Sequence, residues 1–172
     1  MTGARIFATL FVLQVLALLQ TTLPLALGFS VARADLLLVA VLFLAFNAPT
    51  VEGAALSLAA GYLQDLHAAT PDGTYALLAV VMFVATRLVG AYLHAEGGLL
   101  AVAVALVATL VHTVMAAALV RFVAKQGDDG ALLRALSAAM PCAVLTGLAA
   151  PLVFRVLRWI ESRWAAEPEG LL

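Results

Sequence analysis

Residues 35–66 read DLLLVAVLFLAFNAPTVEGAALSLAAGYLQDL, and this stretch decides what kind of fold the chain can form. Two apolar segments flank Pro49, which ends a helix because its ring removes a backbone donor and clashes with the preceding turn. The first segment, residues 36–48, would make roughly 20 Å of helix, whereas the hydrocarbon core of a bilayer is about 30 Å thick. The stretch therefore predicts a hairpin of two short helices within an apolar bundle.

The rest of the chain is equally apolar. Of its 172 residues, 65% are apolar and 11% are charged, and the mean hydropathy is +1.12. A soluble domain has roughly a quarter of its residues charged. Because this chain has too little charge to cover a surface in water, we expect it to lie in a membrane. Its net charge of −1 gives no indication of a nucleic-acid partner.

Four further apolar segments flank the hairpin, and all six must be helical. Unsatisfied backbone groups in hydrocarbon are costly, and these segments lack the alternation of membrane strands. We therefore predict an all-α integral membrane protein, a polytopic bundle of about six transmembrane helices of which the second and third are short. The expected spans are about 6–27, 35–48, 51–66, 74–93, 99–123 and 132–159, within a single domain of residues 1–164.

The last span carries two signals, one for its shape and one for its orientation. Pro141 and Pro151 lie inside it, so we expect it to be kinked. Its final residues, 155–163, combine three arginines with Trp159, which is typical of a cytoplasmic interface. Because six crossings place both termini on one side, we expect both in the cytoplasm, with residues 165–172 as a disordered tail.

The third segment has the clearest local pattern. Gly53, Ser57, Gly61 and Asp65 recur every four residues, which places them on one helix face. Small residues at this spacing let two helices approach closely in a bilayer. The stripe is either an internal packing surface or a surface for the transmembrane helix of a partner protein. We group Gly73, in the following loop, with these packing or partner-binding positions.

Asp35 and Asp65 are expected near the outer surface, one at the start of the second segment and the other at the end of the third. The hairpin through Pro49 makes the two carboxylates potential neighbours. Asp35 is in the right place to cap the N-terminus of its helix. Asp65 lies at a helix C-terminus, where the dipole opposes a negative charge, so it needs a cationic or hydrogen-bonding partner. Arg33 is one candidate cation in this region.

Arg87 is the clearest charged residue within a span. On insertion scales an unpaired arginine at mid-bilayer costs about 2.5–3.5 kcal/mol. Counting residues from the outer surface puts Arg87 and Glu52 at a similar depth, roughly 20 Å down two antiparallel helices. We expect either a Glu52–Arg87 ion pair within the membrane or an Arg87 side chain that extends to the inner headgroups.

The sequence contains no recognisable catalytic set. His112 lies in the middle of the fifth span, where hydrogen-bonded packing is the common role and proton relay the rarer one. The histidines and the single Cys142 lack the spacing of a metal site, and no nucleophile or phosphate-loop motif is present. We therefore expect no catalytic residues, no cofactor and no metal.

The stretch from Arg33 to Gly90 resembles MreD, a small polytopic rod shape-determining protein of bacteria. The resemblance rests on three motifs in order: Ala34-Asp35-Leu36-Leu37-Leu38, then Gly61-Tyr62-Leu63-Gln64-Asp65-Leu66, then Pro71-Asp72-Gly73 before a helix that starts Thr74-Tyr75-Ala76-Leu77. Proteins of this family have a similar length and about six spans. The resemblance also implies a bundle similar in fold to the substrate-binding subunits of energy-coupling-factor vitamin transporters.

The resemblance implies a function as well as a fold. It implies a non-enzymatic scaffold in the bacterial inner membrane that binds MreC and acts with MreB, RodA and a penicillin-binding transpeptidase in cell-wall elongation. In this reading the bundle would hold the partner's transmembrane helix through its small-residue faces.

Two other functions stay open at this point. A substrate-binding transporter subunit would need a ligand cavity, for which Asp35, Asp65 and His112 are the available polar groups. An intramembrane lipid enzyme would need a nucleophile–base pair or a metal set, which the sequence does not offer.

Overall fold

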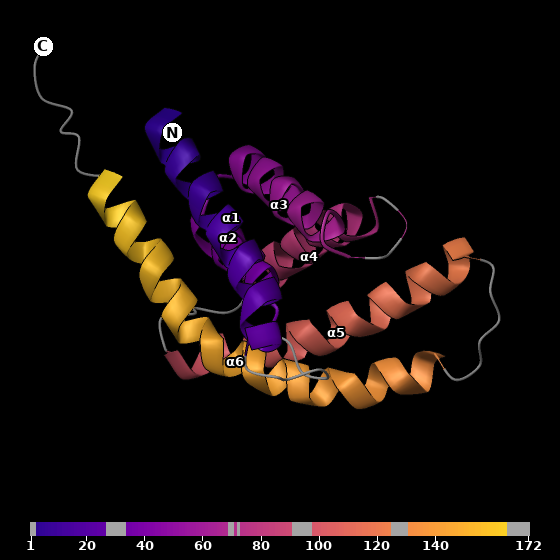
Figure 1. The fold of residues 1–172 in the computed structure, drawn as a ribbon. Coiled ribbons are helices and arrows are strands. Elements are labelled where there is room, and N and C mark those ends of the chain that lie inside the picture. The colour runs from indigo at the N-terminus through magenta and orange to yellow at the C-terminus, as the bar shows by residue number, and fades with distance from the viewer. Residues whose placement is uncertain are drawn as a thin grey trace, which may run out of the picture.

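The computed structural model describes residues 3–26, 34–68, 71, 73–90, 98–124 and 131–164. This part of the chain forms helices joined by turns and contains no strand (Figure 1). The described helices are α1 (Gly3–Ala26), α2 (Leu36–Asn47), α3 (Thr50–Asp65), α4 (Thr74–Gly90), α5 (Gly98–Ala124) and α6 (Ala131–Trp164). They occupy the six segments that the hydropathy pattern indicates, so the all-helical fold class is confirmed.

Helix α2 lies in the interior and contacts each of the other five helices. Every residue from Leu36 to Ala45 is buried. A helix that is apolar all round belongs in the interior of a bundle. Its 12 residues make roughly 18 Å of helix, too little to cross a bilayer of about 30 Å unaided. The surrounding helices shelter this short helix, so it does not depend on spanning the hydrocarbon.

Three of the described helices contain segments long and apolar enough to cross a membrane. These segments are Gly3–Thr22 in α1, Ala101–Phe122 in α5 and Ser137–Arg163 in α6. Helices α2 and α4 are apolar but shorter. The chain therefore has the helices of an integral membrane protein, while the number of complete crossings stays a prediction.

Helix α6 connects two parts of the molecule. Its first part runs beside α5, and it then changes direction and runs along α1 (Figure 1). Pro141 and Pro151 lie inside the helix and remove backbone donors from it, which accounts for the bend that the sequence predicts.

The beginning of α1 and the last turns of α6 lie at the same end of the bundle (Figure 1). The guanidinium of Arg5 donates a hydrogen bond to the carboxylate of Glu161, with Nη2 and Oε1 2.8 Å apart. The guanidinium of Arg163 lies over the ring of Trp159, 5.2 Å from its centroid. The side of the membrane on which this end lies stays a prediction, and the expected tail at 165–172 lies outside the described residues.

The outer surface of the bundle is apolar. Phe7 on α1, Val51 on α3 and Phe122 on α5 are each more than three quarters exposed. Large apolar side chains exposed in such numbers are unusual on a soluble monomer, and they suit contact with lipid.

Candidate functional site

Asp35 caps the N-terminus of α2, as the sequence predicts. Its Oδ1 accepts a hydrogen bond from the backbone N–H of Leu38, over 2.9 Å. A carboxylate here satisfies one of the free donors at the first turn and meets the positive end of the helix dipole. The cap fixes where the buried helix begins.

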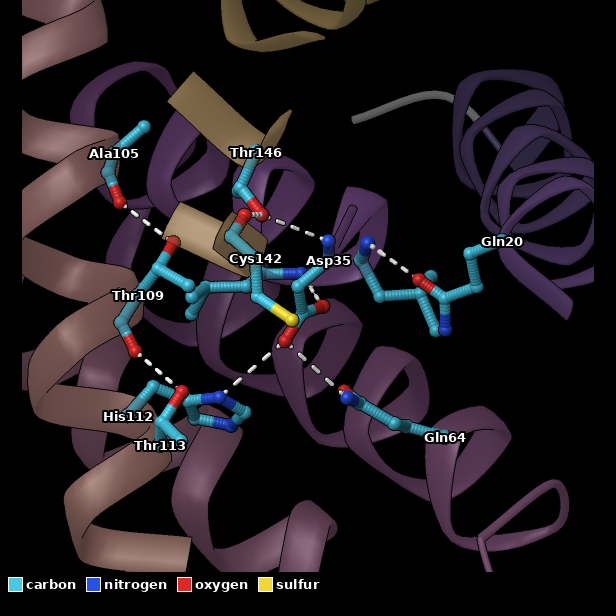
Figure 2. A network of polar contacts seen from close by, with 11 residues as sticks. Gln20, Asp35, Gln64, Ala105, Thr109, His112, Thr113, Cys142 and Thr146 are labelled. Atoms are coloured by element: carbon cyan, nitrogen blue, oxygen red, sulfur yellow. Dashed lines mark hydrogen bonds and ion pairs between the residues drawn. The ribbon is translucent and has the colours of Figure 1, made fainter. Parts of the chain in front are cut away.

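Side chains from other helices converge on this cap (Figure 2). The backbone N–H of Asp35 donates to Oγ1 of Thr146 on α6, over 2.9 Å. Its Oδ2 lies 3.3 Å from Nε2 of Gln64 on α3 and 3.3 Å from Nδ1 of His112 on α5. Oε1 of Gln20 on α1 accepts a hydrogen bond from the N–H of Leu37. The start of α2 is therefore tied to four other helices by polar contacts.

Asp65 caps a different helix from the one that carries it. Its Oδ1 accepts from the backbone N–H of Tyr75, over 2.8 Å, and its Oδ2 accepts from the N–H of Ala76, over 2.9 Å. Both donors belong to the first turn of α4, so the carboxylate meets the positive end of the α4 dipole. This explains how a carboxylate that is only 7% exposed is stabilised at the C-terminus of α3.

Within the part of the chain that the structure describes, the hydrogen-bonding partners of Asp65 are therefore backbone N–H groups. Arg33, the cation considered for this region, lies outside the described residues. The two carboxylates serve neighbouring helix starts, and Gln64 links them because it bonds Asp35 and precedes Asp65 in the chain.

The small-residue stripe of α3 packs against α4 of the same chain. A Cβ added to Gly61 would lie 2.6 Å from Cα of Ala76 and 2.8 Å from Cβ of Ala79. A Cβ added to Gly53 would lie 2.6 Å from the ring of Phe83. Ser57, between the two glycines, is fully buried. The interpretation as an internal packing surface fits this geometry, and the expectation that a partner's helix docks on the stripe does not, because α4 already covers it.

Gly73 has a conformational role and does not contribute to packing. Its φ is +85°, a region that L residues with a side chain rarely adopt, and a Cβ added there would meet nothing within 4 Å. The residue reverses the chain before α4, where Oγ1 of Thr74 donates to the carbonyl of Pro71 over 2.7 Å. Its assignment to the packing or partner-binding positions is therefore corrected.

Arg87 acts at the C-terminus of α2. Its Nη1 donates to the carbonyl oxygens of Ala45, over 3.2 Å, and of Ala48, over 2.8 Å. Its guanidinium also lies over the ring of Phe83, 5.9 Å from the centroid. These carbonyls have no partner within the helix, and a cation there complements the negative end of the dipole.

This arrangement corrects the expected Glu52–Arg87 pair, because Glu52 is not among the groups to which the Arg87 guanidinium donates. Depth counting gives the height of a residue along a helix but not the direction in which its side chain points. The free carbonyls at the end of α2 lie within reach of Arg87, and residue spacing alone does not reveal such backbone acceptors.

A cavity of about 230 Å³ opens beside the Asp35 cap. Asp35, Gln64, Tyr75 and His112 line it, together with residues of α1 and α6. His112 is 5% exposed, and its ring lies 5.8 Å from that of Tyr75. Of the sequence candidates, the structure thus brings Asp35 and His112 together.

Three residues that fix the start of α2 were not predicted from the sequence. Gln20, Gln64 and Thr146 each make a contact that fixes the start of α2. The available signal was that hydrogen-bonding side chains inside apolar spans usually face the bundle interior. Within the described ranges, no group of three or more His, Cys, Asp or Glu side chains is arranged to hold a metal ion.

The polar side chains at the ends of α2 and α4 thus form a set of helix caps, in which charged and amide groups stabilise the ends of short helices. No curated protein and no solved structure matches the chain, so the likeness to energy-coupling-factor subunits stays a prediction. The profile of the family described as rod shape-determining protein MreD matches residues 3–159. The match covers nearly all of the chain, including the capped hairpin, and the chain belongs to the MreD family of rod shape-determining proteins.

Proposed function

We propose that this protein is a non-enzymatic scaffold of the bacterial inner membrane that helps maintain rod shape by binding the transmembrane helix of MreC. Through MreC it would act with MreB, RodA and a penicillin-binding transpeptidase in peptidoglycan synthesis. Membership of the MreD family supports the role in rod shape.

The observation that carries the scaffold role is how the charged side chains inside the bundle are used. Asp35, Asp65 and Arg87 all bond to backbone groups at the ends of α2 or α4. Their hydrogen bonds hold short helices in place, as expected of a rigid support. This use of charge favours a protein that presents a fixed outer surface to partners.

The partner surface must lie on the outside of the bundle, because the small-residue stripe of α3 is covered by α4. Exposed apolar faces are present on α1, around Phe7 and Phe11, and on α6, around Leu148 and Leu152. In a bilayer, association of two helices depends on close packing of such faces. The proposal therefore places MreC on an outer face and does not depend on Gly61.

The test is co-purification of MreC with this protein from membranes of cells that express both. We expect MreC to be retained by the wild type. Exchange of Phe7 and Phe11 for Ala, or of Leu148 and Leu152 for Ala, changes one outer face at a time without touching the caps. The account predicts that alanines on the contacting face reduce MreC recovery several-fold, while the melting temperature of the bundle stays near that of the wild type.

Cell shape provides the second readout of the same experiment. Cells that lack the protein should lose rod shape, and the variant that loses MreC should fail to restore it. If the wild type recovers no MreC, or if no outer face affects its recovery, the binding proposal is wrong.

A further inference from the structure

The cavity beside Asp35 contains polar atoms that the helix caps leave unused. Nδ1 of His112 is directed at Asp35, whereas its Nε2 has no hydrogen-bond partner among the described residues. The phenol oxygen of Tyr75 also lacks one in that part of the chain. Both residues line the cavity, so these polar atoms are open to water or to a ligand there. These two groups, on neighbouring rings whose centroids are 5.8 Å apart, therefore mark the cavity as a place where another molecule can bond.

The charge of the cavity wall restricts what can bind there. Among the described residues, the wall contains the carboxylate of Asp35 and neither lysine nor arginine. The contacts of Oδ2 with Gln64 and His112 are both 3.3 Å, at the long end for hydrogen bonds, so this oxygen keeps capacity to accept a stronger donor. An anion would be repelled by such a wall, whereas a cation with N–H donors would be attracted.

The size of the cavity and the residues of its wall limit which cations could bind there. A volume of about 230 Å³ corresponds to roughly eight water molecules and so to a small group. A compact ammonium could donate to Oδ2 of Asp35, Nε2 of His112 and the phenol oxygen of Tyr75, whose ring adds attraction for a cation. The exposed residue His67 also lines the cavity, so the cavity can be reached from the surface of the bundle.

We propose that this cavity binds a primary ammonium group, held by the Asp35 carboxylate, His112 Nε2 and the Tyr75 hydroxyl. The ammonium can come from a free small amine or from the headgroup of phosphatidylethanolamine in the surrounding bilayer. The site is separate from the outer faces proposed for MreC, so either proposal can fail without the other.

The test compares two lipids on the purified full-length chain in nanodiscs of phosphatidylglycerol. Phosphatidylethanolamine and phosphatidylcholine are added in turn, and native mass spectrometry measures their retention. The two headgroups share a phosphate, but only ethanolamine has N–H donors. We expect phosphatidylethanolamine to be retained about tenfold more tightly than phosphatidylcholine, the ratio that one strong charge-assisted contact provides.

Three variants assign the binding to the cavity. Asp35→Asn keeps a good helix cap but removes the charge, and it should bring the retention of the two lipids together. Tyr75→Phe removes only one oxygen and should weaken phosphatidylethanolamine binding several-fold in a folded protein. Glu161→Gln, the control, removes a carboxylate at the opposite end of the bundle and should leave the retention of both lipids unchanged.

A second arm distinguishes the sources of the ammonium. If a free amine is the ligand, ethanolamine added without phosphatidylethanolamine should raise the melting temperature of the wild type. If the lipid headgroup is the ligand, only phosphatidylethanolamine should raise it. Either result supports the site. Equal retention of both lipids together with no effect of ethanolamine, or binding that survives Asp35→Asn and Tyr75→Phe, overturns it and leaves the cavity to water.

Discussion

Nδ1 of His112 lies 3.3 Å from Oδ2 of Asp35, which joins the middle of α5 to the N-cap of α2. Both side chains are largely buried. This contact shows how the fold uses polar groups: the interior helix α2 is fixed at its start by Asp35 and at its end by Arg87.

Removing the carboxylate of Asp65 should destabilise the hairpin of α3 and α4. Asp65→Ala leaves two N–H groups of α4 without their acceptor, at a cost of about 2–3 kcal/mol in the free energy of unfolding. Asp65→Asn keeps one acceptor oxygen and should lose about half as much. Thermal unfolding in detergent micelles measures both, with Val51→Ala on the exposed side of α3 as the control. An unchanged melting temperature for Asp65→Ala would contradict the cap.

Gly61→Ala should lower stability because its Cβ meets the backbone of α4, which cannot move aside as a flexible side chain can. Overpacking of this kind costs about 1–3 kcal/mol. Gly3→Ala, where a Cβ would meet nothing within 4 Å, is the matched control and should be neutral. We expect MreC recovery to fall with Gly61→Ala only as far as the amount of folded protein falls. Loss of MreC from a fully stable variant would instead place the partner on the stripe.

Arg87→Met should cost about 2 kcal/mol, the usual contribution of hydrogen bonds to a charged group. Arg87→Lys should retain part of the stability because an ammonium can also donate to carbonyl oxygens. The double exchange Arg87→Glu with Glu52→Arg should not restore folding, since a glutamate at position 87 repels the carbonyls of Ala45 and Ala48. Recovery of the folded yield in the double variant would show that an ion pair with Glu52 is the main role of Arg87.

Gly73→Ala should cost about 1–2 kcal/mol because alanine is strained at a φ of +85°. Gly73→Asn should cost less, since asparagine tolerates the left-handed region better. A Cβ added at this position would meet no neighbouring residue within 4 Å, so both variants should keep the packing of α3 on α4. Equal stability of all three proteins, measured by thermal unfolding, would show that the turn can take another conformation.

The hydropathy pattern and turn residues were sufficient to predict the helices and the Asp35 cap. Apolar length and Pro49 divide the chain locally, and a cap acts within one turn of its own helix. The small-residue stripe on α3 was also predictable, because its spacing indicates that one face of the helix is closely packed. The spacing does not show whether the helix packed against that face belongs to the same chain.

The partners of Asp65 and Arg87 could not be predicted in the same way. Each contacts backbone of another helix, and the position of that backbone depends on how the bundle packs. Asp65 reaches the start of α4 because the turn at Gly73 brings the first residues of α4 back to the end of α3. Arg87 reaches Ala48 because α4 packs on α2. The contact between Asp35 and His112 likewise requires α5 to be in place.

The central claim is that α2 is an interior helix, held at both ends and shielded from lipid by the rest of the bundle. Photolabelling of the native chain in vesicles with a lipid-soluble carbene precursor, mapped by mass spectrometry of peptides, tests it directly. We predict strong labelling of the exposed faces around Phe11 and Leu148 and little or none between Leu36 and Ala45. Labelling of α2 as strong as that of α1 would contradict the claim.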